Sequence, residues 1–328
     1  MHPEVKYIGF LTLLYAGTTS IFSFKYLILN NIVKKLKQWS ISADNIFNIK
    51  SEISETLCNE IVVNTENIKP ISVHLPKHLK PISDDQFGHY LAGLIDGDGH
   101  FSSKQQLVIV FHSLDASLAY FIKKRLGYGS VKKRKDKNAF FFVIATKKGL
   151  EKVINLINGK IRIEDKFNQI VNNILNHDNY AELKKKINLK LNLDKNFKNH
   201  WLAGFSDINA SFQIKVLNHN NKIEIKLNFQ INQKKNTILL LIKDFLGGNI
   251  GYIKSQNSYY YESIGFGSAR NVINYFDYFH LLSSKHVNYF KWRKVYAIIQ
   301  NKNNLNINNI KKIMKLKNTI NRLSDTII

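Results

Sequence analysis

Two carboxylates separated by one glycine, Asp96 and Asp98, stand at the end of an apolar run. The run reads HYLAGLIDGDGHF over residues 89–101; its apolar residues recur at helical spacing, and Gly93 and Gly97 lie four residues apart. Because small residues on one face let a second backbone approach closely, the run predicts a helix that packs tightly against another helix. Such a crossing would bring an acid from each helix tip to a shared point.

A second copy of the pattern, HWLAGFSDINASF, occupies residues 200–212. It repeats the small residues and the first acid, but it has Ile208 and Asn209 where the first copy has Gly97 and Asp98. Each copy is followed by an alternating stretch that predicts strands. The predicted helix interface is formed by the matched small residues of both copies, Ala92, Gly93, Ala203 and Gly204.

Both runs resemble the signature of the LAGLIDADG homing endonuclease and maturase family, in its single-chain form with two motifs. Residues 91–99 match the signature at nearly every position, whereas residues 202–210 match in their first half and then depart. The resemblance implies an α+β fold of two pseudo-symmetric αββαββα halves. Each half would hold a curved four-stranded antiparallel sheet, and the paired motif helices would join the halves.

The elements expected after each motif recur in the same order, which indicates an internal repeat. They are strand pairs over 101–110, turning near Ser103 and Lys104, and over 212–231, with a tip at 217–221; helices over 118–126 and 238–246, each ending at glycine; strands over 140–146 and 259–265; and a closing helix in each half. We therefore divide the chain into an N-terminal arm and linker (1–82), a first half (83–190) and a second half (191–328). Ser83 or Asp84 is expected to cap the first motif helix.

The N-terminal arm contains an uncharged stretch over residues 7–24, which is at the lower edge of the length that spans a membrane. A leader, a hydrophobic arm, read-through of upstream sequence and membrane contact all stay open for this stretch. Residues 41–81 are polar and weakly patterned, and they are read as a linker.

The net charge is strongly positive: Lys and Arg total 48 and Asp and Glu total 24, giving +24. The expected partner is a polyanion, which is nucleic acid or an anionic membrane surface. The one cysteine, Cys58, excludes an internal disulfide and a thiolate zinc cluster. Abundant Ile, Asn and Lys indicate AT-rich coding DNA of the fungal mitochondrial type, so a mitochondrial, mitochondrially encoded protein is predicted.

Polar and basic side chains at alternate strand positions predict a surface that binds nucleic acid. An ordinary solvated sheet face is the competing interpretation. A basic run at 132–137 is expected to form a hairpin tip that holds phosphates. The predicted nucleic-acid contacts are Lys104, Gln106, Lys132, Lys133, Arg134, Lys135, Lys137, Gln213, Lys215, Lys226 and Gln230. His219, His280 and His286 have no spacing that indicates a metal site.

The resemblance also implies the chemistry of the helix tips. In such families the last acid of each motif and a neighbouring backbone carbonyl bind Mg²⁺ between the two scissile phosphates, a role that falls here to Asp98 and the Gly97 carbonyl. The partner position is Asn209, whose amide oxygen can ligate a cation but brings no negative charge. Lys148 and Arg270 are expected to lie near the scissile phosphates, where the family places basic residues.

Two functions of different classes follow. In one, the protein is a maturase-like binder that assists group I intron splicing, with a degenerate or weak endonuclease site. In the other, it is an active Mg²⁺-dependent, site-specific endonuclease that cuts double-stranded DNA. The expected partners are double-stranded DNA, group I intron RNA or both, and the protein is expected to be a monomer.

Overall fold

The first motif forms helix α3 (Asp84–Asp98) in the computed structural model, which describes residues 70–134, 138–219, 222–300 and 306–320. Its start is fixed by a capping box at Ser83. The backbone N–H of Gln86 donates to Ser83 Oγ at 3.1 Å, and the Ser83 N–H donates to Gln86 Oε1 at 3.4 Å. Two otherwise unpaired donors are satisfied in this way, which stabilises the helix start. The predicted cap at Ser83 is confirmed.

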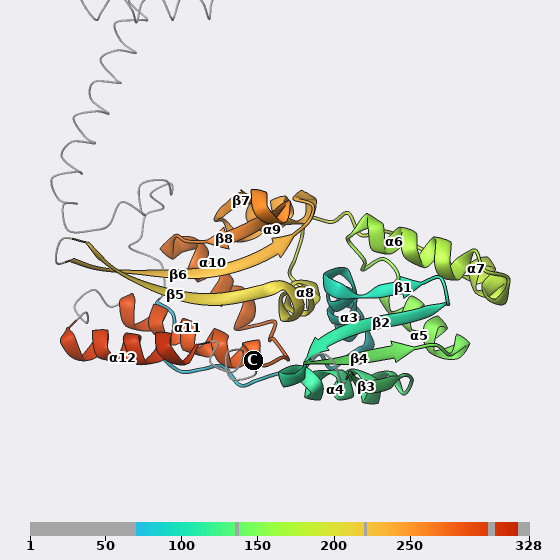
Figure 1. Ribbon diagram of the computed structural model, residues 1–328, viewed down its shortest axis with the longest axis horizontal. Coiled ribbons are helices and arrows are strands. Elements are labelled where there is room, and N and C mark those ends of the chain that lie inside the picture. Colours follow the sequence, from blue (N-terminus) through green and yellow to red (C-terminus); the bar gives the residue numbers. More distant parts are fainter. Residues whose placement is uncertain (1–69, 135–137, 220–221, 301–305, 321–328) are drawn as a thin grey trace, which may run out of the picture. The chain divides into compact units, whose positions relative to one another are not determined.

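The second motif forms helix α8 (Trp201–Asn209), which crosses α3 at backbone contact distance (Figure 1). A Cβ atom added to Gly93 would lie 2.0 Å from the Trp201 carbonyl oxygen, and one added to Gly204 would lie 2.0 Å from the Tyr90 carbonyl oxygen. A residue with a Cβ atom at either position would therefore clash with the backbone of the other helix. The predicted close crossing of the two motif helices is therefore confirmed.

Each half folds as αββαββα, as expected. The first half continues from α3 with β1 (His100–Ser102), β2 (Gln106–His112), α4 (Ala116–Leu126), β3 (Ser130–Arg134), β4 (Ala139–Ile144) and α5 (Lys147–Ile157). The second half continues from α8 with β5 (Ala210–His219), β6 (Lys222–Gln233), α9 (Thr237–Leu246), β7 (Asn249–Ile253), β8 (Ser258–Ser263) and α10 (Phe266–Phe276). The antiparallel sheets have the orders β1-β2-β4-β3 and β5-β6-β8-β7, so the two halves share one topology.

Two predicted hairpin tips are corrected by the strand register. The basic residues Lys132, Lys133 and Arg134 lie in β3, paired with the β4 segment 139–141, and not in a tip. β4 is aromatic there and supplies the partner edge that a strand needs. Likewise β5 runs on to His219, so the expected tip at 217–221 is shorter than predicted. Residues 135–137 and 220–221 lie outside the described part of the chain.

Each half is followed by helices that the sequence patterns did not predict. The first half adds α6 (Glu164–Ile170), which runs into a π-helical turn over Val171–Leu175, and α7 (Ala181–Lys186). The second half adds α11 (Lys285–Ile299) and α12 (Ile307–Thr319). In Figure 1, α6 and α7 lie beyond β1, and α11 runs along the second sheet. These additions supply side chains to the motif helices.

The core lies between the sheets and helices of each half and continues through the crossing helices. Along β2, Leu107, Ile109 and Phe111 are buried, and along β6, Leu227, Phe229 and Ile231 are buried. The alternate residues of these strands face away from the core. Among the described helices, none is long and apolar enough to cross a membrane, and the hydrophobic stretch at 7–24 is not part of the described chain.

Candidate nucleic-acid interface and metal position

The tips of α3 and α8 meet at Gly97. A Cβ atom added to Gly97 would lie 3.0 Å from Asn209 Nδ2 and 3.0 Å from Ile208 Cβ. Gly97 thus leaves the space that Ile208 and Asn209 fill. The last residues of the two helices, Asp98 and Asn209, occupy the equivalent ends of the pseudo-symmetric pair. The structure therefore brings Gly97 and Asn209, two of the three residues of the predicted metal position, into contact.

Asp98 and Asn209 differ in their surroundings. Asp98 is exposed; partial desolvation raises the pKa of its carboxyl group, and the Lys166 ammonium opposes that rise. Asn209 is half-buried, and its Nδ2 atom is buried without a hydrogen-bond partner among the described residues. An unpaired buried donor costs free energy. The second helix tip therefore holds an unsatisfied amide where the first holds an anion.

The inner acids of the motifs, Asp96 and Asp207, are buried and hold the helices together. Asp96 Oδ2 accepts from Trp201 Nε1 of α8 at 2.8 Å, and Asp207 Oδ2 accepts from the Tyr90 hydroxyl of α3 at 2.6 Å. Each acid thus accepts a hydrogen bond from the opposite motif helix. Burial raises the pKa of both, that of Asp96 to about 7, while the hydrogen bonds donated to each oppose the rise.

The same two carboxylates also bind backbone outside the motifs. Asp96 accepts from the N–H of Arg162 at 2.8 Å, and Asp207 accepts from the N–H of Leu282 at 2.8 Å. Arg162 precedes α6 and Leu282 precedes α11, so the two halves repeat this connection. A positioning role for Asp96 and Asp207 follows, separate from the exposed Asp98.

Two lysines that the sequence did not single out lie at the helix ends. Lys166 Nζ of α6 donates to the Gly99 carbonyl at 2.6 Å, and Lys285 Nζ of α11 donates to the Ile208 carbonyl at 2.7 Å. The last carbonyls of a helix lack partners within it, so an ammonium group is favourable there. No local motif marks these lysines, because they come from the helices that follow each repeat.

The pKa of Lys285 leads to a prediction about stability. Burial lowers this pKa from 10.5 to about 8, although Asp207 and Asp115 raise it. Between these two values the unfolded chain holds the proton and the folded chain releases it. The unfolded state then binds more protons, so this group makes the free energy of unfolding increase as the pH rises from about 8 to 10.5.

We expect Lys285→Met to lack this increase. Urea unfolding at intervals across the window measures it as the difference between the parent and the variant. Lys294→Met, on the exposed face of the same helix, is the matched control and should parallel the parent. If the free energy of unfolding changed with pH in the same way for Lys285→Met and the parent, the prediction would be contradicted.

Lys148 and Arg270 lie on the helices that follow β4 and β8. Lys148 is exposed in the first turn of α5, and Arg270 is half-buried in α10. Their role near scissile phosphates stays a prediction.

The donor set at the helix tips does not fit a centre that needs a carboxylate from each helix. The predicted ligands are the Asp98 carboxylate, the Gly97 carbonyl and the Asn209 amide, and only Asp98 is negatively charged. Lys166 and Lys285 add two positive charges close to the same helix ends. Mg²⁺ prefers oxygen ligands that include carboxylates, so we expect a set with one carboxylate to bind it poorly. No cleavage step through Mg²⁺ follows from this arrangement.

The face of the second sheet that points away from the core carries a row of amides. Ser211 pairs with Gln230, Gln213 with Asn228, and Lys215 with Lys226. Neighbouring side chains along β6 contact one another. Gln230 Nε2 donates to Asn232 Oδ1 at 2.9 Å, and Lys226 Nζ lies 3.2 Å from Glu224 Oε1. Amide side chains can pair with base edges in a major groove. Asn228 is buried despite its outward position.

The corresponding face of the first sheet is different. Its central outward positions are Val108 and Val110 of β2 and Phe141 and Val143 of β4, all half-buried. Lys104 lies in the β1–β2 turn, and Gln106 is the first residue of β2. The expectation of a polar outward face is therefore wrong for the middle of the first sheet. The polar residues behind this expectation, Lys104 and Gln106, lie in the β1–β2 turn and at the start of β2, outside the middle of the sheet.

The basic residues of β3 point to opposite faces of the sheet, as its pairing with β4 shows. Lys132 and Arg134 pair with Phe141 and Ala139 on the outward face, and the Arg134 guanidinium lies 5.5 Å from the Phe141 ring centroid. Lys133 pairs with Phe140, two residues from the buried Phe142, so it points to the helix side of the sheet. Two of these three cations therefore share the outward face.

The chain that folds into two crossing motif helices between two four-stranded sheets also shows direct sequence similarity to a known family. A family model described as LAGLIDADG endonuclease matches residues 91–177 and again 202–296. The chain belongs to this family. Both matches begin within the motif helices and run through the sheets of their respective halves.

Relatives of the chain include proteins with three kinds of name. The chain is 60% identical over 319 residues to "Uncharacterized cox1 intron-2 37.2 kDa protein" of Schizosaccharomyces pombe, covering 94% of this chain and 97% of that protein. It is 28% identical to "Probable intron-encoded endonuclease 4" of Neurospora crassa, over 74% of this chain and 45% of that protein. It is 29% identical to "Intron-encoded RNA maturase bI4" of Saccharomyces cerevisiae, over 68% of this chain and 35% of that protein.

Solved structures share the fold. The I-LtrWI LAGLIDADG homing endonuclease bound to target DNA superposes with a TM-score of 0.58 at 19% identity, over 73% of this chain and 99% of that one. I-SmaMI bound to uncleaved DNA in the presence of calcium ions gives a TM-score of 0.52 at 20% identity, over 71% and 98%. At such identities the likeness establishes the fold alone.

Proposed function

We propose that this protein binds nucleic acid through its two sheets and assists splicing of a group I intron, as a maturase-like member of its family with a degenerate endonuclease site. One observation carries the proposal. At the shared helix tip, Asn209 replaces the second carboxylate, and its Nδ2 atom is buried without a partner. Binding needs no metal at this position, whereas cleavage does.

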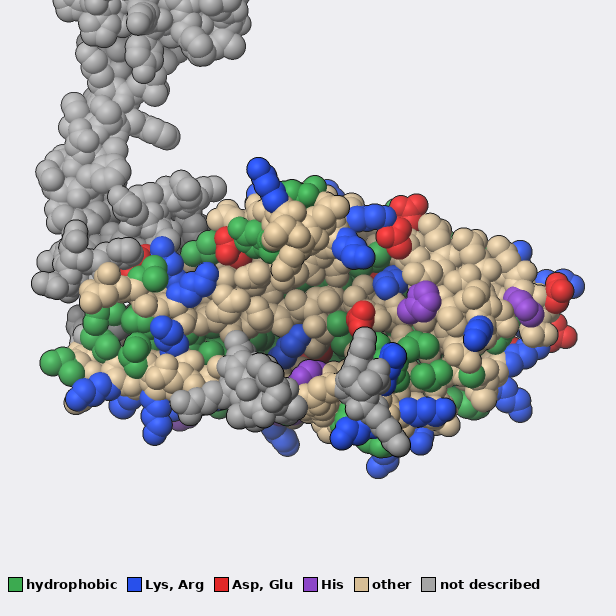
Figure 2. All heavy atoms as spheres, viewed as in Figure 1, with side chains coloured by type: hydrophobic (Ala, Val, Ile, Leu, Met, Phe, Trp, Pro, Cys, Tyr) green, Lys and Arg blue, Asp and Glu red, His purple; other side chains and the backbone are tan. Residues whose placement is uncertain are grey.

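The charge and the relatives support nucleic acid as the partner. The net charge is +24, and in Figure 2 the Lys and Arg side chains on the visible face are more widespread than the Asp and Glu side chains. One relative is named an RNA maturase, and I-LtrWI is bound to its DNA target. We therefore propose double-stranded DNA, group I intron RNA, or both as ligands. A monomer suffices, because one chain supplies both motif helices.

The relatives also support a location. A protein 60% identical over 319 residues is named for a cox1 intron. Combined with the Ile-, Asn- and Lys-rich composition, this name supports a mitochondrially encoded intron protein that acts in the mitochondrion.

The second candidate function is a Mg²⁺-dependent endonuclease that cuts double-stranded DNA at a specific site. Asp98 favours this function, because it retains the charged ligand of the first motif at an exposed position. Several relatives carry endonuclease names. Under this alternative, the weakened second position would reduce double-strand cleavage or leave only nicking of one strand.

The two functions are separated by one paired experiment. The purified protein is incubated with supercoiled plasmid that carries the joined exons flanking its own gene, and in parallel with the precursor RNA of its own intron. We expect faster splicing and little cleavage. Robust double-strand cleavage without any effect on splicing would reject the maturase-like proposal in favour of the endonuclease.

The opposite orientations of the basic residues in β3 give a prediction about affinity for nucleic acid. Lys132→Ala with Arg134→Ala removes two outward cations, so affinity should fall for every sequence, and the salt slope should become shallower by about one for each cation that contacts phosphate. Lys133→Ala is the matched control, because its side chain points to the helix side. Equilibrium binding at several salt concentrations measures both. Equal losses for the control and the double variant would contradict the assignment.

The amide row of the second sheet gives a prediction about sequence preference. Gln230→Met keeps the length of the side chain and removes its donors and acceptor, so discrimination at one position should fall by about 1–3 kcal/mol. Selection from a randomised target library, compared with Val110→Ala on the first sheet, measures the preference. A uniform loss of affinity across all sequences would count against base readout by Gln230.

A further inference from the structure

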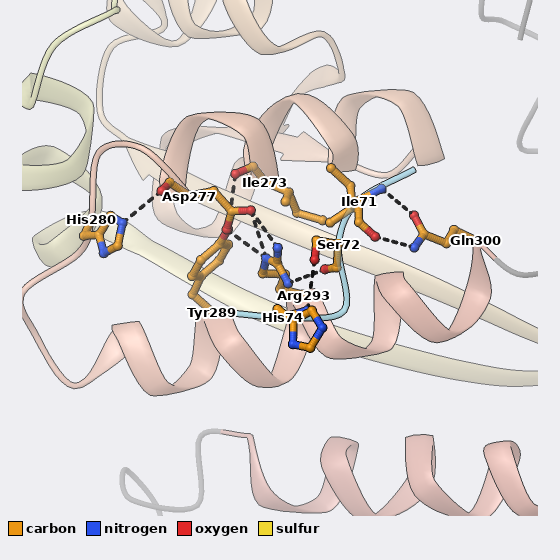
Figure 3. Close-up of polar contacts among 9 residues, drawn as sticks. All are labelled: Ile71, Ser72, His74, Ile273, Asp277, His280, Tyr289, Arg293 and Gln300. Atoms are coloured by element: carbon orange, nitrogen blue, oxygen red, sulfur yellow. Dashed lines mark hydrogen bonds and ion pairs between the residues drawn. The ribbon is translucent and has the colours of Figure 1, made fainter. Parts of the chain in front are cut away.

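The segment that leads into the first motif helix is bound to the second half of the protein. Ile71 N–H donates to Gln300 Oε1 at 2.9 Å, and Gln300 Nε2 donates to the Ile71 carbonyl at 2.6 Å (Figure 3). Arg293 Nη1 donates to the Ser72 carbonyl at 2.9 Å. Residues 70–82 therefore lie along α11 before the chain enters α3.

A partly buried ion pair connects the two helices α10 and α11. Arg293 of α11 binds Asp277, which follows α10, with Nε at 2.8 Å from Oδ1 and Nη2 at 2.8 Å from Oδ2. The Tyr289 hydroxyl donates to the same Asp277 Oδ1 at 2.6 Å (Figure 3). A bidentate pair of this kind both stabilises the contact and sets the relative orientation of the two side chains. The loop between α10 and α11 is thus anchored at its start.

Three histidines meet beside this loop. His78 comes from the segment 70–82, His280 from the α10–α11 loop and His286 from the first turns of α11. One ring nitrogen of each lies within 4.8 Å of those of the other two. The sequence spacing of His280 and His286 did not indicate a metal site, because the third histidine is distant in the chain.

The hydrogen bonds leave suitable nitrogens for a ligand. His280 Nε2 lies 2.9 Å from the Asp277 carbonyl, and His78 Nε2 lies 2.9 Å from the Leu281 carbonyl. Since a carbonyl only accepts, Nε2 carries the proton in both rings, and Nδ1 is unprotonated. In His280 this Nδ1 accepts a 3.2 Å hydrogen bond from the Leu79 N–H. Histidines that bind metal commonly donate their other nitrogen to a backbone carbonyl in this way.

His286 supplies the observation that points to a ligand. Both of its ring nitrogens are buried without a hydrogen-bond partner among the described residues. The neutral imidazole ring offers a lone pair on one nitrogen, and this is the form of histidine that binds a metal. The ring of His286 is half-buried, and two buried nitrogens without partners are costly unless one of them gains a partner.

We infer that His78, His280 and His286 form a binding site for a transition-metal dication of the Zn²⁺ class, which fastens the segment 70–82 to the α10–α11 loop. Imidazole ligands suit Zn²⁺, Co²⁺, Ni²⁺ and Cu²⁺ and disfavour Mg²⁺. His280 Nδ1 would give up a 3.2 Å hydrogen bond from the Leu79 N–H to bind the metal. His78 is exposed, so water can complete the coordination.

The site is independent of the proposed function, and binding tests it directly. The full-length protein, held in millimolar Mg²⁺ to occupy sites for hard cations, is titrated with Co²⁺ and followed by visible absorption. We expect one equivalent to give the intense bands of four-coordinate Co²⁺, and Zn²⁺ to abolish them. Zn²⁺ should also raise the thermal unfolding midpoint.

Matched variants decide whether the three histidines are responsible. His78→Ala changes an exposed residue and should lower Zn²⁺ affinity at least about tenfold. His74→Ala, on the same segment but outside the cluster, should bind like the parent. His286→Gln should abolish the Co²⁺ bands, and His78→Ala keeps the test valid if that variant does not fold. The absence of stoichiometric Co²⁺ bands in the parent, or bands unchanged in His78→Ala, would overturn the inference.

Discussion

Asn209→Asp combined with Ile208→Ala is expected to create or strongly increase Mg²⁺-dependent cleavage of duplex DNA. The first substitution places a second carboxylate at the shared helix tip. The second removes the side chain whose Cβ lies 3.0 Å from the Cβ position of Gly97. Stabilisation of transition-state charge by a metal is worth several kcal/mol, and each ~1.4 kcal/mol is a factor of ten in rate. We therefore expect a gain of at least about a hundredfold.

The gain is measured as the rate of plasmid linearisation on the protein's own target sequence. Asp98→Asn in the repaired background should abolish cleavage and leave DNA binding nearly unchanged, which separates the metal from the interface. Ile208→Ala alone is the matched control and should remain inactive. A repaired protein with no activity would mean that the loss of the second carboxylate is not what limits cleavage.

Gly93→Ala is expected to destabilise the protein severely. The added Cβ would lie 2.0 Å from the Trp201 carbonyl oxygen and 2.8 Å from the Phe205 nitrogen. These are backbone atoms of α8, so relief requires the two motif helices to separate. We expect a loss of about 3 kcal/mol or more in the free energy of unfolding, or failure to fold. Gly204→Ala should behave alike, because its Cβ would lie 2.0 Å from the Tyr90 carbonyl oxygen.

Thermal unfolding measures this effect, and Gly127→Asn provides the control. Gly127 caps α4 at a φ of 75°, with no atom within 4 Å of an added Cβ, and asparagine tolerates that conformation. The control should unfold close to the parent. In a domain of this size, 1 kcal/mol shifts the midpoint by roughly 2–4 °C. A Gly93→Ala midpoint within that interval of the parent would refute backbone contact at the crossing.

Several structural features were readable from local sequence. The αββαββα order followed from two motif copies and from repeated helix and strand periods, and the close crossing followed from glycines at helical spacing. The cap at Ser83 followed from its side-chain chemistry. In these cases the residues that cause the structure lie within a few positions of one another, or the same short pattern occurs twice in the chain.

Other features depended on which segments meet. The basic run at 132–137 predicts a hairpin tip from its charge alone, because the sequence does not show which strand its first three residues pair with. The pairing with β4 decides that Lys132 and Arg134 face outward and that Lys133 does not. Val108 and Val110 are typical strand residues in the sequence. The pairing of β2 with β4 shows that they lie on the outward face, which was expected to be polar.

The family, the two motif helices and the missing carboxylate at Asn209 can all be recognised from residue types at a fixed spacing. The contacts of Lys166 and Lys285 with the ends of those helices, and the meeting of His78 with His280 and His286, become visible once the chain is folded. These groups are brought together by the packing of α6, α11 and the segment 70–82. No local periodicity records a contact between segments some two hundred residues apart, because it depends on how the whole core packs.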